Sequence, residues 1–206
     1  MEVYVRNLVF LMSVFILLWF TTYSFLNNSN FGMPVQQRPE QSILEPGPVS
    51  DIQPGDILLI RGDTWVDKII KLVTRSPYSH VVGVVNSDHV VEILPFSTAR
   101  FKKIQDYTGR ADVFTCERLS NDDRTKIISY VNGKLGTSYN YNLLFWEASR
   151  YFLNWVWPYE NKDSSICSTL WSEAYRKAGI DLCPDVKFPA PGDLAKSRYL
   201  HKVSEY

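Results

Sequence analysis

Cys167 is the residue of this sequence best placed for covalent chemistry. It lies in residues 163–171, "DSSICSTLW", after two serines and before an apolar run with helical spacing. A cysteine attacks as its thiolate, and both a helix N-terminus and a neighbouring imidazolium favour that form. Ser164 or Ser165 is the expected N-cap, which puts Cys167 in the first turn. Its backbone N–H is then also free to stabilise an oxyanion.

A structural role for the same cysteine is the alternative. Cys167 shares one face of the predicted helix with the apolar residues Leu170, Trp171 and Ala174. Free cysteines behave as small hydrophobic side chains and are often fully buried. Taken alone, this segment favours a buried cysteine, so the decision depends on a partner base.

The chain has three histidines, and His80 is the candidate base. His201 lies in the polar segment "RYLHKVSEY" and is expected to be exposed, and His89 follows a turn and is expected to be exposed or half-exposed. His80 instead opens the apolar strand "HVVGVV", where the alternative is a purely structural histidine.

Glu92 is the candidate orienting residue, because the hairpin register can be worked out from its loop. A three-residue loop at 86–88 places Val82 opposite Glu92. Since side chains alternate along a strand, His80 and Glu92 then share one face as diagonal neighbours about 7–8 Å apart. The alternative for Glu92 is an edge-strand carboxylate that faces solvent.

The elements that must position these residues predict an α+β domain. Strands are expected at 57–60, 79–85, 89–94 and 111–119. Helices are expected over 63–74, from a cap at Ser120 or Asn121 to Gly136, and from Cys167 to about residue 179. Strands followed by helices favour a small sheet covered by helices in one domain.

Composition excludes several classes of function. The 206 residues carry 22 basic and 22 acidic side chains, and no long basic run is present, which argues against a nucleic-acid partner. The sequence has no CxxC and no HExxH, so no metal site is expected. No organic cofactor is expected either.

The N-terminal segment predicts a membrane anchor. Residues 8–26 carry no charge and approach the length of about 20 residues that a membrane-spanning helix needs. We divide the chain into an anchor at 1–27, a flexible linker at 28–50 and a catalytic domain at 51–206. Arg6 favours a cytoplasmic N-terminus and an extracytoplasmic domain. A cleaved signal peptide is the alternative.

The order of the motifs resembles a known family. The strings "PGDILLI", "YSHVVGVV", "VVEIL", "GTSYNY", "ICSTLWSEAYRKAGI" and "PAPGDL" are similar to those of the permuted papain-like enzymes of the NlpC superfamily, in particular the YiiX/YebB-like subgroup. The similarity covers roughly residues 52–198. It implies a circularly permuted papain-like fold, with a small antiparallel sheet packed against the helix that carries the cysteine.

The resemblance also implies site residues and a reaction. Cys167 corresponds to the nucleophile, His80 to the base and Glu92 to the orienting residue. Tyr139 and Ser168 correspond to substrate or oxyanion contacts, although Asn140 stands where the family often has aspartate. The implied reaction is hydrolysis of an amide in a peptide or cell-wall-like substrate through a thioester. The alternatives are a lipid acyltransferase or lipase using the same Cys–His pair, and an inactive binding module. The oligomeric state is left open.

Two further features leave alternatives open. Cys116 and Cys183 are expected to be structural, and in an oxidising compartment they could pair with each other. The aromatic stretch 143–159 is read as a helix packed on the domain, with an aromatic lid or membrane contact as the alternative.

Overall fold

The sequence of β1, "ILLI", is apolar at every position because this strand lies in the middle of the sheet and is buried on both faces. The computed structural model describes residues 52–140, 142–143, 146, 149–150 and 165–206, all of which fall within one unit, residues 46–206. The described elements are, in chain order, β1 (Ile57–Ile60), α2 (Trp65–Thr74), β2 (His80–Val84), β3 (His89–Glu92), β4 (Arg100–Lys103), the 3-10 helix η1 (Ile104–Tyr107), β5 (Ala111–Thr115), α3 (Asn121–Asn132), α5 (Cys167–Lys177), α6 (Pro191–Leu194) and β6 (His201–Glu205).

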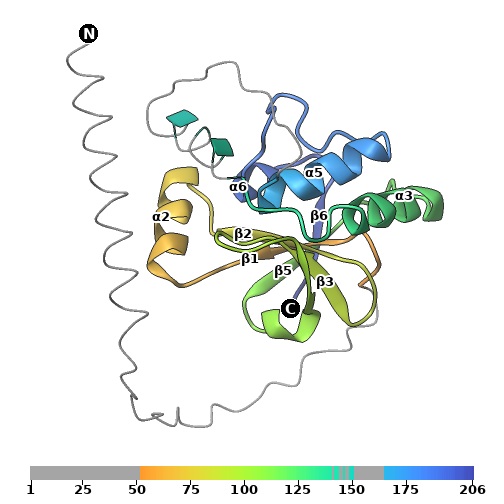
Figure 1. Ribbon diagram of the computed structural model, residues 1–206, viewed down its shortest axis with the longest axis horizontal. Coiled ribbons are helices and arrows are strands. Elements are labelled where there is room, and N and C mark those ends of the chain that lie inside the picture. Colours follow the sequence, from red (N-terminus) through yellow and green to blue (C-terminus); the bar gives the residue numbers. More distant parts are fainter. Residues whose placement is uncertain (1–51, 141, 144–145, 147–148, 151–164) are drawn as a thin grey trace. The chain divides into compact units, whose positions relative to one another are not determined.

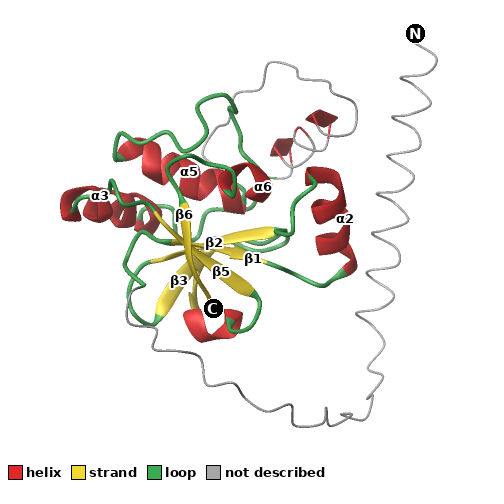
Figure 2. Ribbon diagram, turned by 180° about the vertical axis from the view of Figure 1, so that it is seen from behind, coloured by secondary structure: helices red, strands yellow, loops and turns green. Residues whose placement is uncertain are grey.

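The strands form one six-stranded sheet in the order β4-β3-β2-β1-β5-β6, and every neighbouring pair is antiparallel. Helices α3 and α5 lie together on one face of the sheet, and α2 lies at the opposite end of the domain from α3 (Figures 1 and 2). The expected α+β class and antiparallel sheet are therefore confirmed.

Two apolar clusters occupy the two faces of the sheet. The larger one joins Leu59, Val81 and Val91 to the inner face of α5, including Trp171. The smaller one lies on the other face, around Leu58, Val82 and Val90, and is closed by Ile104 and Tyr107 of η1.

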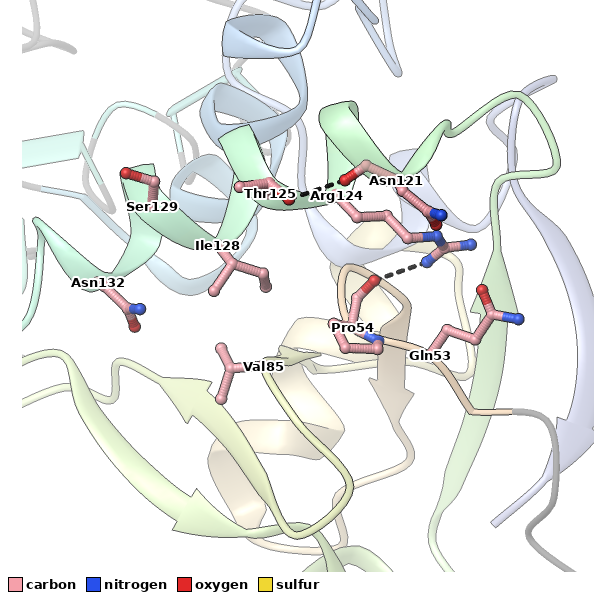
Figure 3. Close-up of a pocket in the computed structure, with 9 residues that line it drawn as sticks. All are labelled: Gln53, Pro54, Val85, Asn121, Arg124, Thr125, Ile128, Ser129 and Asn132. Atoms are coloured by element: carbon pink, nitrogen blue, oxygen red, sulfur yellow. Dashed lines mark hydrogen bonds between the residues drawn. The ribbon is translucent and has the colours of Figure 1, made fainter.

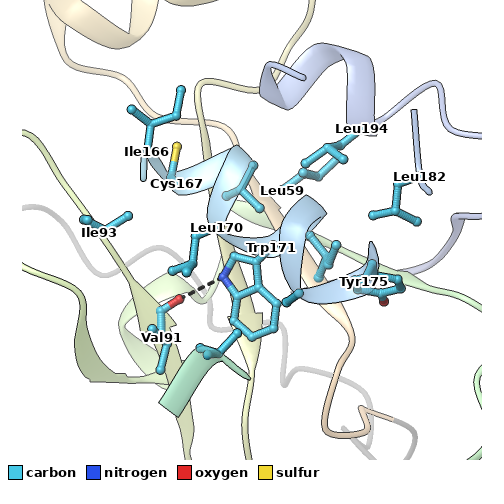
Figure 4. Packing of buried hydrophobic residues seen from close by; sticks show 14 of the residues in the cluster. Leu59, Val91, Ile93, Ile166, Cys167, Leu170, Trp171, Tyr175, Leu182 and Leu194 are labelled. Atoms are coloured by element: carbon cyan, nitrogen blue, oxygen red, sulfur yellow. Dashed lines mark hydrogen bonds between the residues drawn. The ribbon is translucent and has the colours of Figure 1, made fainter. Parts of the chain in front are cut away.

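Trp171 fixes the position of α5 on the sheet. Its indole Nε1 donates a hydrogen bond to the Val91 carbonyl at 3.3 Å (Figure 4). The ring lies directly over Gly83, where an added Cβ would come within 2.3 Å of the indole atoms. A side chain at position 83 would therefore push the helix away from the sheet.

Several elements differ from the sequence predictions. Segment 201–205, expected as part of a polar tail, is the edge strand β6, and β4 was not predicted. The helix capped by Ser120 ends at Asn132 rather than Gly136. The N-cap of α5 is Ile166 and not Ser164 or Ser165, because the Ile166 N–H is satisfied by the Thr169 hydroxyl at 3.0 Å.

The predicted anchor at 8–26 and linker at 28–50 lie outside the described residues. Within the part that is described, no helix has the length and apolar character needed to cross a bilayer.

Candidate active site

The predicted hairpin register is confirmed. Gly83 pairs with Val91 and Val84 with Val90, which is the register that sets Val82 opposite Glu92. His80 and Glu92 consequently lie on one face, and Nε2 of His80 is 3.8 Å from Oε2 of Glu92. This separation is that of an ion pair and is too long for a direct hydrogen bond.

The two strands separate at the point where the candidate residues lie. Pairing between β2 and β3 covers Gly83 and Val84 and stops before His80, while β2 continues its pairing with β1 as far as His80. The Cys167 thiol lies at this opening, where the backbone N–H of Val81 donates to its sulfur.

The structure therefore brings Cys167 and His80 together from segments far apart in the chain. Cys167 is the first residue of α5 and is 9% exposed, and the side chain of His80 is 12% exposed. The thiol and the ring are close enough that each shifts the pKa of the other. The ring atom Nε2, which faces Glu92, has no hydrogen-bond partner among the described residues.

The electrostatics of the pair favour a thiolate and an imidazolium. Burial disfavours the charged form of the ring, but the Cys167 thiolate and Glu92 outweigh it and raise the pKa of His80 to about 9. Burial likewise opposes ionisation of the thiol. The His80 imidazolium and the N–H groups of Val81 and Ser168 outweigh that effect, so the pKa of Cys167 is lowered.

Glu92 is held as a buried carboxylate by two residues that the sequence did not predict. Arg100 donates to Oε1 from Nε at 3.0 Å and from Nη2 at 2.9 Å. The Tyr107 hydroxyl donates to Oε2 at 2.5 Å. Burial raises the pKa of Glu92, yet His80, Tyr107 and Arg100 together lower it to about 2. The solvent-facing alternative for Glu92 is wrong, because the residue is only 2% exposed.

The start of α5 has no side-chain cap among the described residues. The Thr169 hydroxyl bonds to the N–H and the carbonyl of Ile166 rather than to the N–H groups of the first turn. Ser168 is fully buried, and its hydroxyl has no hydrogen-bond partner among the described residues.

Tyr139 lies beside the chain that leads into this helix. Its backbone forms a parallel bridge with Ser165, and the N–H of Asn140 donates to the Ser165 carbonyl at 3.1 Å. The Asn140 side chain accepts from the Leu143 N–H at 2.9 Å. These contacts position the segment before Cys167, and a contact of the Tyr139 side chain with substrate remains a prediction.

The other sequence candidates lie apart from this site. All three cysteines are free thiols, so the pairing of Cys116 with Cys183 is wrong. His201 is exposed and His89 is partly exposed, as expected. In the aromatic stretch, Trp146 is buried and packs edge-on against Phe188, with ring centroids 5.2 Å apart. Residues 151–164 lie outside the described part of the chain.

A second hollow in the surface does not contribute catalytic groups. It lies between the β2–β3 turn and α3, with Val85, Arg124 and Ile128 in its lining (Figure 3). Its one charged residue, Arg124, is engaged by the Pro54 carbonyl at 2.6 Å and by Asp56 at 3.1 Å.

The side chains near Cys167 do not form a metal site. Both oxygens of Glu92 are occupied by Arg100 and Tyr107, which leaves one thiol and one imidazole. Across the described ranges, no three His, Cys, Asp or Glu side chains gather as a ligand set.

Comparison with known proteins identifies a shared fold. Neither a protein-family model nor a curated protein matches this sequence. Among solved structures, it is similar to the crystal structure of YiiX from Escherichia coli O157:H7, described there as a metalloprotein of DUF1105. The TM-score is 0.60 at 18% identity, over 75% of this chain and 98% of that one. The chain thus has a YiiX-like fold.

Proposed function

We propose that this chain is a membrane-tethered cysteine hydrolase that cleaves an amide bond in a peptide or cell-wall-like substrate. The observation that carries the proposal is the Cys167–His80 pair, with the thiol at the N-terminus of α5 and the ring beside the Glu92 carboxylate. A papain-like assignment of the fold belongs to the same proposal.

The proposed reaction begins from the ion pair. The Cys167 thiolate attacks the carbonyl carbon, and the first-turn N–H groups of α5 stabilise the oxyanion. The His80 imidazolium then donates its proton to the leaving amine as the C–N bond breaks, which leaves a thioester on Cys167. A water molecule next gives a proton to His80 and attacks the thioester, so that the acid product and the thiolate are released.

Glu92 acts in this scheme as a positioning residue. Its charge favours the protonated ring, and its bonds to Arg100 and Tyr107 fix its own orientation. At 3.8 Å from Nε2 the carboxylate is beyond hydrogen-bond distance of the ring, so its part is electrostatic.

Labelling with an iodoacetamide probe tests the proposal. Cys167 is expected to react faster than Cys116 and Cys183, because its surroundings lower its pKa and place its thiol beside an imidazole, whereas burial raises the pKa of Cys183. His80→Ala is expected to abolish this fast labelling and to reduce amide hydrolysis by about 10²–10⁴-fold, the usual contribution of an acid–base group. Equal, slow labelling of all three cysteines would refute the proposal that this chain is a cysteine hydrolase.

The acyl-transfer alternative differs only in what resolves the thioester. An alcohol or amine acceptor in place of water would make the chain a lipid acyltransferase. Parallel assays on peptide amides and on acyl lipids, with release of free acid scored against transfer to an acceptor, distinguish the two reactions.

A further inference from the structure

Helix α2 turns an apolar stripe to the solvent. Trp65, Ile69 and Leu72 are 58%, 46% and 79% exposed, and they recur at the spacing of one helical face. An amphipathic helix normally buries such a face against its own domain. In α2 only Thr74 is buried, so the helix presents its apolar face outward.

The orientation of α2 is fixed by contacts on its other side. Thr64 and Asp67 form a reciprocal capping box at its start. Lys71 Nζ donates to the Gly62 carbonyl at 2.6 Å, and Asp67 packs so closely on Gly62 that a Cβ there would overlap its carboxylate. The outward stripe is thus built into the fold.

The chemistry of this face matches a lipid surface. An aromatic residue, Trp65, and two aliphatic residues are flanked by the exposed cations Lys68 and Arg75, and the exposed acid next to them is Asp63. Trp at the boundary, aliphatic side chains in the acyl region and cations at the head groups are the pattern of helices that lie in a membrane interface.

The chain that precedes the domain keeps it close to a bilayer if residues 8–26 span one, as we predict. The predicted linker, residues 28–50, is rich in Asn, Gln, Pro and Ser, and a flexible segment of this length averages about 24–29 Å from end to end. Such a tether raises the effective concentration of the bilayer at the domain, so a weak interfacial contact is sufficient for docking.

Helix α2 also borders the candidate active site. Burial raises the pKa of its residue Asp67, but hydrogen bonds from Ser79 and Thr64 and, to a smaller extent, the charge of His80 lower it, so Asp67 lies close to the residue next to His80 and to His80 itself. The Ser79 hydroxyl in turn accepts from the Gly62 N–H at 3.2 Å.

We propose that α2 docks the domain on the bilayer surface through Trp65, Ile69 and Leu72, and so holds the Cys167–His80 site at the lipid interface. The inference extends the proposed function by assigning the substrate to molecules whose scissile carbonyl lies in the head-group region. Only this assignment of the substrate rests on the proposed function, because docking itself needs no catalysis.

Photo-crosslinking in the full chain tests this docking. Leu72→benzoylphenylalanine is reconstituted in vesicles of phosphatidylcholine and phosphatidylglycerol that contain a traceable alkyne lipid. The matched control is Lys126→benzoylphenylalanine on α3, an exposed position at the opposite end of the domain. We expect lipid adducts at position 72 in several-fold excess over position 126.

Other crosslinking results would identify a different partner for the exposed face of α2. Crosslinks from position 72 to residues 8–26 of the same chain, or to a second copy, would overturn the proposal, as would equal lipid labelling at both positions. The same measurement in a Cys167→Ala background separates docking from catalysis: adducts that persist there support docking even where no hydrolysis is found in the parent chain.

Discussion

The charge state of the Cys167–His80 pair decides when the thiol is reactive. A raised His80 pKa keeps the ring protonated to high pH, and a lowered Cys167 pKa keeps the thiol ionised to low pH. Between the two values the site holds an ion pair, which is the form competent both for attack and for protonation of a leaving group.

Activity and labelling should therefore depend on pH in different ways. We expect kcat/KM for amide hydrolysis to fall as pH rises through about 9, where His80 loses its proton. Labelling of Cys167 should already be fast below the ordinary cysteine pKa of about 8.5. Cys183 is the internal control, because burial raises its pKa to about 12. A labelling rate for Cys167 that rises through pH 8.5 as for a free thiol would contradict the ion pair.

Replacement of the orienting carboxylate tests its role through His80. Glu92→Gln removes a charge that raises the His80 pKa, so the alkaline limb of the pH profile should move to lower pH. A downward shift of one pKa unit lowers the protonated fraction of His80 about tenfold only at pH values above its pKa of about 9, so we expect a loss in kcat/KM of about tenfold there and little change at neutral pH.

The matched control for this change is Glu173→Gln. Glu173 lies on α5, the helix that begins at Cys167, and its carboxylate accepts a hydrogen bond from the Tyr130 hydroxyl at 2.8 Å. Its replacement should leave the profile in place. If Glu92→Gln reduced the rate without moving the alkaline limb, Glu92 would have only a structural role.

At the scale of single residues, the sequence predicted that His80 and Glu92 lie together, but it did not predict the residues that hold Glu92 in place. The three-residue loop was sufficient to derive the register of His80 and Glu92. Arg100 and Tyr107 were missed because they come from a short polar strand and a 3-10 turn, neither of which has an apolar period. An acid inside an apolar strand did signal that some partner must exist, since an unpaired buried charge is costly.

At the scale of elements, the contact between α5 and the sheet sets where the thiol lies. Trp171 packs on Gly83 and bonds to Val91, one helical turn from Cys167. The same packing that buries the apolar face of α5 therefore carries its first residue to the opening between β2 and β3.

Gly83→Ala should disturb this contact. The new Cβ overlaps the Trp171 ring, and overpacking of this kind destabilises a core by about 1–3 kcal/mol. We expect a lower urea midpoint for the full chain in mild detergent, followed by tryptophan fluorescence. Gly133→Ala is the control, because Gly133 has a helical φ of −67° and a Cβ there meets no side chain. Equal midpoints for both variants would contradict the role assigned to Gly83.

Sequence patterns predicted the buried elements well and the edges poorly. The segments that form β1, β2 and β3 are rich in apolar residues, a composition that predicts buried strands. Strand β6 is exposed at all five positions, so its pairing with β5 leaves no hydrophobic signal. The N-cap of α5 was predicted at the wrong residue because the Thr169 hydroxyl bonds to the N–H of Ile166, which precedes it in the chain. The presence of serines near a helix start does not by itself identify the capping residue.

At the scale of the whole molecule, the predicted N-terminal anchor would determine on which side of a membrane the proposed chemistry takes place. Residues 8–26 are predicted to cross the membrane with the N-terminus in the cytoplasm. Protease added to intact cells should then digest the domain, and the intact mass should include residues 1–26. Protection of the domain until the cells are opened would reverse the orientation, and loss of the first residues would favour a cleaved signal peptide.

The separation of β2 from β3 has a pharmacological consequence. His80 belongs to the strand pair β1–β2, whereas Glu92 and Arg100 belong to the pair β3–β4. The distance between ring and carboxylate is thus a property of two backbones that are not hydrogen-bonded to each other at this point. A rigid small molecule wedged between them would part the ring from its carboxylate without touching the sulfur. An inhibitor of the proposed reaction that acted in this way would need no group that reacts with the thiol.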